Sequence, residues 1–192
     1  MSYCQQIEGV QLDMAVVDAC AAAVQGKGNG RVSSEDAHQV FKYIKDDNKV
    51  TSNDELWALR YCLTEFNFTE AAGDWITSAV GAISKRDQVK APQGGSSKSC
   101  YEQVDGVECD RELLEVCKAV AGTGDGRLSK DDAEKLPKDV GPKVMDTQKW
   151  SVRLCLSDFF WTETAHDFIV EELKASPRKR PAEATVGRGF GR

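Results

Sequence analysis

The chain has 192 residues, of which 41% are hydrophobic, and a formal net charge of −6 at pH 7. This length and composition suit one ordinary domain or two small ones with a buried core. No stretch approaches the roughly 18 consecutive apolar residues of a membrane-spanning helix, and the first residues lack the basic start and apolar run of a secretory leader. We therefore expect an intracellular, cytoplasmic protein that does not insert into a membrane.

The seven cysteines are an odd number and are spread along the chain. They form no Cys-x-x-Cys pair, and no histidine lies nearby to complete a zinc site. In an intracellular protein such cysteines are usually reduced. We expect free thiols.

An internal duplication runs through almost the whole chain. The stretch IEGVQLDMAVVDACAAAV matches VDGVECDRELLEVCKAV, GNGRVSSEDA matches GDGRLSKDDA, and WALRYCLTEFNFTEAAGDWI matches WSVRLCLSDFFWTETAHDFI. Between the copies, residues 84–99 are rich in Pro, Gly, Ser and Lys, which is typical of a flexible linker. The sequence thus predicts two homologous domains, repeat 1 (residues 3–83) and repeat 2 (residues 100–175).

Apolar residues recur at helical spacing in each repeat. The first helix of repeat 1 carries Leu12, Val16, Cys20 and Val24, and repeat 2 answers with Leu113, Cys117 and Val120. A middle helix is expected at about 52–66 and a last helix after Thr69, which, like Thr162, is placed as an N-cap. The prediction is an all-α fold with roughly four helices per repeat.

A glycine-rich loop precedes one helix in each repeat. Ser33 with Asp36, and Ser129 with Asp132, have the spacing of a capping box, in which serine and acid bond each other's backbone N–H groups. We also expect the extended residues 31–33 to lie beside 49–51 as a short two-strand β clip, with a matching clip in repeat 2. A phosphate-binding loop is not favoured, because such loops follow a strand and carry other glycine patterns.

The order helix, glycine-rich loop, short extended pair, serine, acid, helix resembles the EF-hand family of helix-loop-helix calcium clamps. The resemblance predicts two tandem EF-hand-like domains and assigns metal-ligand positions to Asn29, Asp36, Thr123, Asp125, Ser129 and Asp132. The sequence departs from the pattern at the first loop position, which is Gln25 or Ala121 instead of Asp. Calcium is therefore the one cofactor that the resemblance implies, and the same acids have a second interpretation as helix caps.

No catalytic motif is present. HExxH, GxSxG, the kinase set and a Cys-His pairing are all missing from the sequence. His38 and His166 each lack an equivalent histidine in the other repeat, and we expect both on the surface. The sequence therefore predicts a protein without enzymatic activity.

Two functional hypotheses follow. The first is a non-catalytic protein-interaction or scaffold module built from two degenerate EF-hand-like domains, with an unidentified protein as partner. The alternative is a calcium-responsive binding protein that uses the loop of repeat 2. Only three methionines occur, so the Met-rich groove of calcium sensors is missing, which favours the first hypothesis.

The charges are divided unevenly along the chain. Beyond Leu173 the sequence carries six basic residues and one acid, which leaves the rest acidic. An acidic body argues against nucleic acid binding there. We expect residues 176–192 to be a disordered basic tail that contacts an acidic partner or directs the protein to the nucleus.

Overall fold

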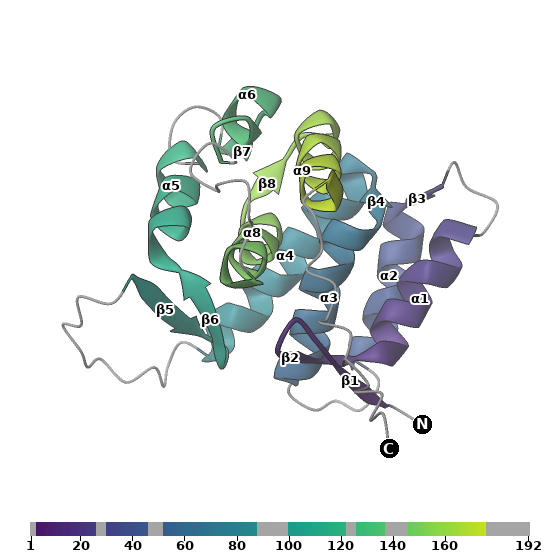
Figure 1. Cartoon of the computed structure of the whole chain (residues 1–192). Helices are drawn as coiled ribbons and strands as arrows, with labels where there is room; N and C mark the ends of the chain where they lie inside the picture. Colours follow the sequence, from purple (N-terminus) through teal and green to yellow (C-terminus); the bar gives the residue numbers. More distant parts are fainter. Residues whose placement is uncertain are drawn as a thin grey trace, which may run out of the picture.

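The computed structural model describes residues 3–25, 30–45, 52–87, 100–121, 126–136 and 146–175. This part is mostly helical with small two-stranded sheets (Figure 1), in agreement with the expected all-α class. None of its helices is long and apolar enough to cross a membrane. The predicted tail lies outside the described residues, and so does the predicted linker apart from residues 84–87.

The two repeats contain the same series of elements. Repeat 1 consists of β1 (Cys4–Ile7), β2 (Val10–Asp13), α1 (Met14–Gln25), β3 (Arg31–Val32), α2 (Ser34–Lys45), α3 (Asn53–Glu65), β4 (Asn67–Phe68) and α4 (Glu70–Asp87). Repeat 2 consists of β5 (Tyr101–Val104), β6 (Val107–Asp110), α5 (Arg111–Ala121), β7 (Arg127–Leu128), α6 (Lys130–Ala133), α8 (Asp146–Asp158), β8 (Phe160–Trp161) and α9 (Glu163–Ala175). Helix α4 continues past residue 83 into the predicted linker.

Each repeat opens with a β-hairpin that the helical pattern did not predict. Strand β1 pairs with β2, and β5 pairs with β6, both antiparallel. The two turn residues have positive φ in both hairpins, at 49° and 81° for Glu8 and Gly9 and at 50° and 82° for Asp105 and Gly106. Positive φ at both central residues is the type I′ geometry that fits the twist of two-residue hairpins. The acid-glycine pairs in IEGV and VDGV are the local signal for these turns.

A short two-strand clip is present in each repeat, with a partner strand that the sequence did not predict. Strand β3 pairs in parallel with β4, joining Val32 to Phe68, and β7 pairs with β8 in the same way. Residues 49–51, the expected partner, lie outside the described residues. The observed pairing is favoured because β4 leads directly into α4, so that buried Phe68 packs beside buried Val32.

Helix caps follow the sequence closely. The hydroxyl groups of Thr69 and Thr162 each accept a bond from a backbone N–H one turn into α4 or α9, at 3.3 Å in both cases. This confirms both predicted N-caps. Helix α3 is capped by Ser52, whose side chain forms a capping box with Glu55. The cap thus lies at the first residue of the range in which this middle helix was expected.

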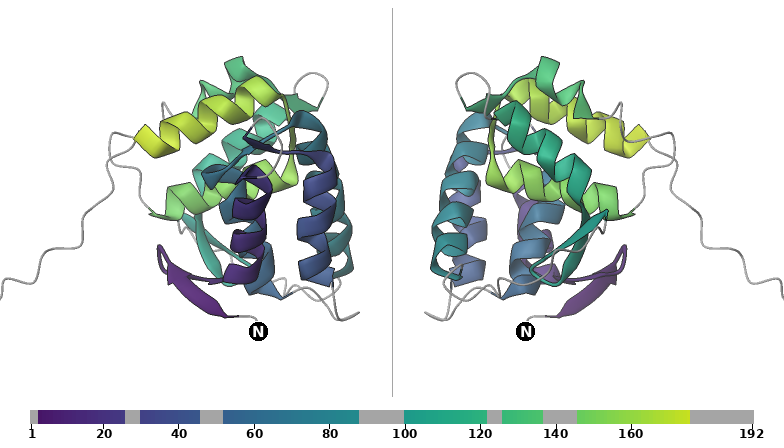
Figure 2. Two further views of the ribbon diagram at one scale, coloured as in Figure 1. Left: turned by 90° about the vertical axis from the view of Figure 1, so that its right-hand side faces the viewer. Right: turned by 90° about the vertical axis from the view of Figure 1, so that its left-hand side faces the viewer.

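The two repeats share one buried core. Helix α3 packs against α8, α4 against α8 and β8, and α9 against β4. The buried apolar side chains of both repeats belong to a single cluster. Figure 2 shows the same arrangement from two sides, with the helices of repeat 1 lying against those of repeat 2.

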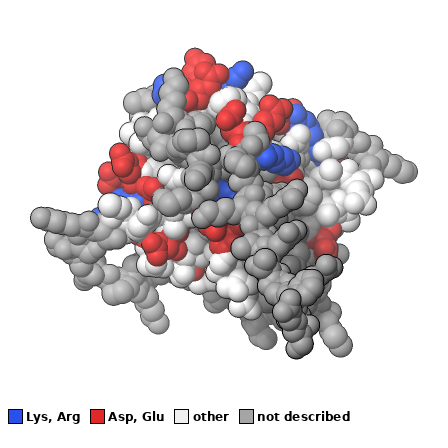
Figure 3. All heavy atoms as spheres, in the orientation of Figure 1, with Lys and Arg blue, Asp and Glu red and all other residues white. Residues whose placement is uncertain are grey.

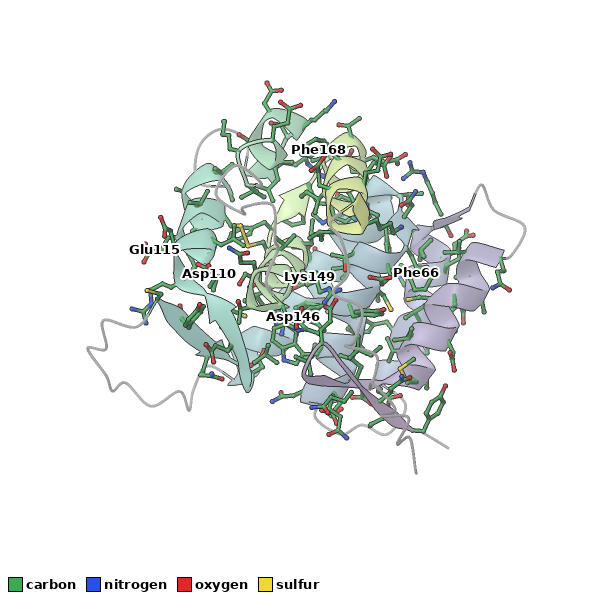
Figure 4. The ribbon with its side chains drawn as sticks, viewed as in Figure 1. Phe66, Asp110, Glu115, Asp146, Lys149 and Phe168 are labelled. Atoms are coloured by element: carbon green, nitrogen blue, oxygen red, sulfur yellow. A yellow bond between two sulfur atoms is a disulfide. The ribbon has the colours of Figure 1, made fainter. Side chains whose placement is uncertain are left out.

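One cysteine pair departs from the expected reduced state. Cys117 of α5 and Cys155 of α8 form a disulfide with a Cα–Cα distance of 6.4 Å, drawn as the yellow bond in Figure 4. The expectation of free thiols was wrong here, because the helical stripes bring these two buried side chains together. Their equivalents in repeat 1, Cys20 and Cys62, are buried free thiols.

Candidate functional site

The residues that the EF-hand resemblance assigns to a metal fall into two groups. Asn29, Thr123 and Asp125 lie outside the described residues. Asp36, Ser129 and Asp132 are described, and they lie at the start of the helix that follows each loop. The structure therefore tests the local role of the second group only.

In repeat 2 the described loop acid caps its own helix. The Asp132 carboxylate accepts bonds from the Ser129 backbone N–H at 3.1 Å and the Ser129 hydroxyl at 2.7 Å. The Asp132 N–H donates back to the serine oxygen at 3.3 Å. Lys135 also donates to the carboxylate at 2.9 Å, and the Lys135 and Ser129 bonds lower the pKa of Asp132. The predicted capping box is confirmed.

Repeat 1 forms the same capping box. Ser33 donates to the Asp36 carboxylate from its backbone N–H at 3.0 Å and from its hydroxyl at 2.7 Å. The Asp36 N–H donates to the Ser33 hydroxyl at 3.2 Å. Within the described ranges, no cluster of three or more His, Cys, Asp or Glu side chains is arranged to hold a metal ion.

The densest polar constellation lies instead between the repeats. Arg60 of α3 is 2% exposed, and its Nη1 donates to the Asp105 carboxylate at the β5–β6 turn, at 2.9 Å. Its Nε donates to the Ser157 hydroxyl of α8 at 3.1 Å. The guanidinium lies 4.4 Å from the ring centre of Trp57. We call this group the Arg60 cluster; it uses a carboxylate of repeat 2 to neutralise a buried charge of repeat 1.

Repeat 2 contains the reciprocal group, the Arg153 cluster. Arg153 of α8 is 3% exposed and pairs with Glu8 at the β1–β2 turn. Its Nε donates to the Thr64 hydroxyl of α3 at 2.8 Å, and its guanidinium lies 4.3 Å from the ring centre of Trp150. In a twofold interface, residue i of one half contacts residue j of the other, and residue j of the first half contacts residue i of the second. The repeats therefore pack as a pseudo-symmetric pair.

Lys149 adds a second cation to the Arg153 cluster alone. Its ammonium group lies 2.8 Å from Glu8 and 3.9 Å from Asp146; Figure 4 labels Lys149 and Asp146 on neighbouring turns of α8. Burial by itself raises the pKa of Glu8, but Arg153 and Lys149 outweigh burial and lower it below the ordinary value. The position equivalent to Lys149 in repeat 1 is Leu56. The Arg153 cluster is therefore the more highly charged of the two.

Two tryptophans meet at the centre of the repeat interface. Trp57 and Trp150 contact edge to face with ring centres 5.4 Å apart. Each indole N–H donates to a backbone carbonyl of the opposite hairpin turn, at 3.2 Å to Asp105 and at 3.1 Å to Glu8. The turns are thus held by indole, guanidinium and carboxylate contacts together.

A second set of ion pairs closes the outer edge of the interface. Arg31 of β3 binds both carboxylate oxygens of Asp167 on α9, and Arg127 of β7 binds both oxygens of Asp74 on α4. Each arginine also donates to the carbonyl of the clip partner in its own repeat. Bidentate pairs of this kind fix orientation as well as adding energy.

His166 corrects one prediction from the sequence. His38 is exposed as expected, but His166 is 0% exposed and its Nε2 donates to the Leu63 carbonyl of α3 at 2.7 Å. Burial lowers the pKa of His166 to about 4. The histidine is buried because α9 packs across the interface onto repeat 1.

Sequence reasoning missed the interface arginines, although the repeat carries a signal for them. WALRYCL and WSVRLCL keep Trp and Arg at matching positions inside otherwise apolar segments. A charge retained twice on an apolar face indicates a buried partner, but the partner lies in the other repeat and has no local signature. No family model matches the chain, and neither a curated protein nor a solved structure shows significant similarity to it.

Proposed function

We propose that this chain is a non-catalytic protein-interaction module built from two degenerate EF-hand-like repeats that pack as one unit. The observation that carries the proposal is the role of the loop acids. Asp36 and Asp132 are each bonded to their own capping serine, and Asp132 also to Lys135. The helix-loop-helix frame is thus held by its own side chains, with the carboxylates acting as structural groups.

The surfaces that remain for a partner differ between the repeats. The exposed positions of α1 hold Asp18, Ala22 and Gln25, whereas those of α5 hold Glu112, Glu115, Lys118 and Ala119. Acidic side chains also lie in several groups over the face shown in Figure 3. Charged residues are depleted at the centres of protein interfaces. We therefore assign partner binding to the sparsely charged outer face of α1.

A matched pair of substitutions tests this assignment. Ala22 and Ala119 are exposed and occupy equivalent positions in α1 and α5. The wild-type chain and both variants are used to capture the partner from a cell extract, and the captured protein is quantified by mass spectrometry. We expect Ala22→Lys to lose the partner and Ala119→Lys to retain it. Circular dichroism should show the same helix content in all three proteins. Equal capture by both variants would rule out the α1 face.

Calcium separates this proposal from the alternative of a calcium-responsive protein. We expect capture to be the same with millimolar calcium and with a chelator, and titration calorimetry to show no calcium-dependent heat. A heat of binding that disappears in both Asp125→Ala and Asp132→Asn would favour the alternative, because both belong to the loop of repeat 2.

The basic tail is a separate part of the proposal. Residues 176–192 lie outside the described residues, and their Lys and Arg content suits an acidic partner or nuclear import. Deleting them should change the location of the protein in cells while leaving its melting temperature within about 1 °C. A larger thermal shift would show that the tail contributes to the fold.

A further inference from the structure

The two repeats fill equivalent places at their interface with different rings. In the first place, Phe68 of β4 meets His166 of α9 edge to face, with ring centres 5.9 Å apart. His166 donates to the carbonyl of Leu63 at 2.7 Å. His166 also stacks on Trp161 of its own repeat, with ring centres 4.3 Å apart. The imidazole therefore contacts a ring of each repeat, and the ring N–H comes from repeat 2.

In the second place, the Trp161 ring occupies the space that an imidazole would need. Trp161 of β8, the equivalent of Phe68, lies over Gly73 of α4, the equivalent of His166. A Cβ atom on Gly73 would lie 2.1 Å from the Trp161 ring. The Trp161 indole N–H donates at 3.0 Å to the carbonyl of Leu156, which is the equivalent of Leu63. The bond that His166 makes across the interface is made here within repeat 2.

In each place, the two residues together match the available space and the available hydrogen-bond acceptor. Phe68 with His166 and Trp161 with Gly73 each fill one place and each supply one N–H to a helix carbonyl. Because interiors are close-packed, an unmatched exchange leaves a void or a clash. Two copies of repeat 2 would bring Trp161 of one copy against His166 of the other, in the space where a Cβ atom on Gly73 would already clash. Two copies of repeat 1 would bring Phe68 against Gly73 and leave the Leu63 carbonyl without its donor.

The charged contacts do not distinguish the repeats in this way. Arg60 with Asp105 and Arg153 with Glu8 place the same signs at equivalent positions. The outer pairs, Arg31 with Asp167 and Arg127 with Asp74, are equally interchangeable. Like repeats would keep these arginine–carboxylate attractions, and a pair of two repeats 1 would lose only the contact of Lys149 with Glu8. The rings therefore make the main difference between like and unlike pairs.

We propose that the exchange of rings is a pairing rule: the interface of repeat 1 accepts a repeat 2, from its own chain or from a second copy, and rejects another repeat 1. This is a specificity for unlike partners, created by excluding the like pair as well as by fitting the unlike one. It goes beyond the proposed binding of an external protein, which uses another surface.

The test uses the full chain with a protease site placed in residues 84–99. The folded protein is cleaved, exchanged through brief exposure to denaturant, and analysed by native mass spectrometry. We expect the wild type to give complexes of one repeat 1 with one repeat 2. Complexes of like repeats, or complete dissociation in native buffer, would overturn the proposal.

Two variants isolate the rings. Gly73→His should lower the melting temperature of the intact chain by roughly 5–10 °C, because the introduced imidazole and the Trp161 indole cannot share the second place. Adding Trp161→Phe makes the second place a copy of the first, so the double variant should regain most of this loss. After cleavage it should also form like pairs, which the wild type does not.

The exchange Ala71→Thr with Thr164→Ala is the matched control. These two positions are equivalent and exposed on α4 and α9. The control should pair as the wild type does. If the double variant is no more stable than Gly73→His, or still forms only unlike pairs, the rings do not set the pairing rule.

Discussion

Both repeats place two cysteines between the same two helices, yet only repeat 2 joins them. Cys117 and Cys155 are bonded, whereas Cys20 and Cys62 remain thiols. Burial, and after it the neighbouring Cys20 thiol, raise the pKa of Cys62 well above its ordinary value. A protonated buried thiol reacts slowly. Equivalent positions therefore provide a covalent link in one repeat and ordinary packing in the other.

The arginine clusters show a difference of the same kind. Asp105 is 39% exposed and faces Arg60, whereas Glu8 is 24% exposed and faces both Arg153 and Lys149. The frame of hairpin, tryptophan and arginine is common to the repeats. What distinguishes them is how strongly the same frame is bonded: the hairpin of repeat 1 is held by two cations and the hairpin of repeat 2 by one.

The largest expected effect comes from removing the carboxylate of the Arg153 cluster. Glu8→Ala removes the carboxylate that Arg153 and Lys149 share, which leaves Arg153 with Glu65 at 3.6 Å and Lys149 with Asp146 at 3.9 Å. Because Arg153 is buried, the change should lower the free energy of unfolding by about 3–5 kcal/mol. Asp105→Ala should cost about 1–2 kcal/mol, because Asp105 is 39% exposed and water can take the place of its carboxylate. Urea denaturation of both variants measures the difference. Equal losses would show that the clusters are equivalent after all.

Reduction of the disulfide should come next. Cys117 and Cys155 are 38 residues apart in sequence, and opening a loop of this size should lower the free energy of unfolding by about 2–4 kcal/mol. Denaturation with and without reductant measures this loss, and differential alkylation identifies the cysteines involved. In Cys117→Ala/Cys155→Ala, reductant should have no further effect. A response that persists in this variant would place the redox-sensitive bond elsewhere.

His166 should make stability depend on pH. Its pKa is about 4 in the folded chain and 6.5 as the ordinary value, so below pH 6.5 the unfolded chain binds the proton first. Stability is therefore complete above pH 6.5 and falls as the pH drops toward 4, by about 3 kcal/mol at most. His166→Gln keeps an N–H donor for Leu63 but does not titrate. Its melting temperature should fall less steeply over this range, and identical slopes would exclude the histidine.

The smallest effect is expected at the caps. Ser129→Ala and Ser33→Ala should each lower the free energy of unfolding by about 0.5–2 kcal/mol. The loss should be the same with calcium and with a chelator, because the serine acts on the backbone of its own helix. A loss that appears only with calcium would assign the serine to a metal site.

The sequence predicts this molecule well wherever contacts are local. The duplication and the serine and threonine caps are all readable from spacing. Turn chemistry was also readable, since Glu8-Gly9 and Asp105-Gly106 are hairpin signals, but the helical pattern on their C-terminal side outweighed it. The ends of the helices could be predicted from the sequence because they depend on residues only a few positions apart.

Residue spacing did not predict the contacts between residues that lie far apart in the sequence. The partner of β3 is chosen by tertiary packing of Phe68, and the partners of Arg60 and Arg153 lie 45 and 145 residues away. His166 was expected on the surface because repeat 1 has no equivalent histidine. Its counterpart in repeat 1 is Gly73, and repeat 2 has no glycine at that position either. The candidate metal residues remain a prediction where the loops lie outside the described residues.

The reciprocal hairpins also impose an order on synthesis. During synthesis Glu8 leaves the ribosome before its partner Arg153, which follows 145 residues later. At roughly 5–20 residues per second, the first hairpin waits roughly 7–30 s for the side chain that holds it. A nascent chain that stops before Arg153 has neither the Arg153 cluster nor the Trp57–Trp150 contact. Completion of the fold therefore depends on synthesis of repeat 2, and a product that stops before Arg153 exposes the interface to chaperones and proteases.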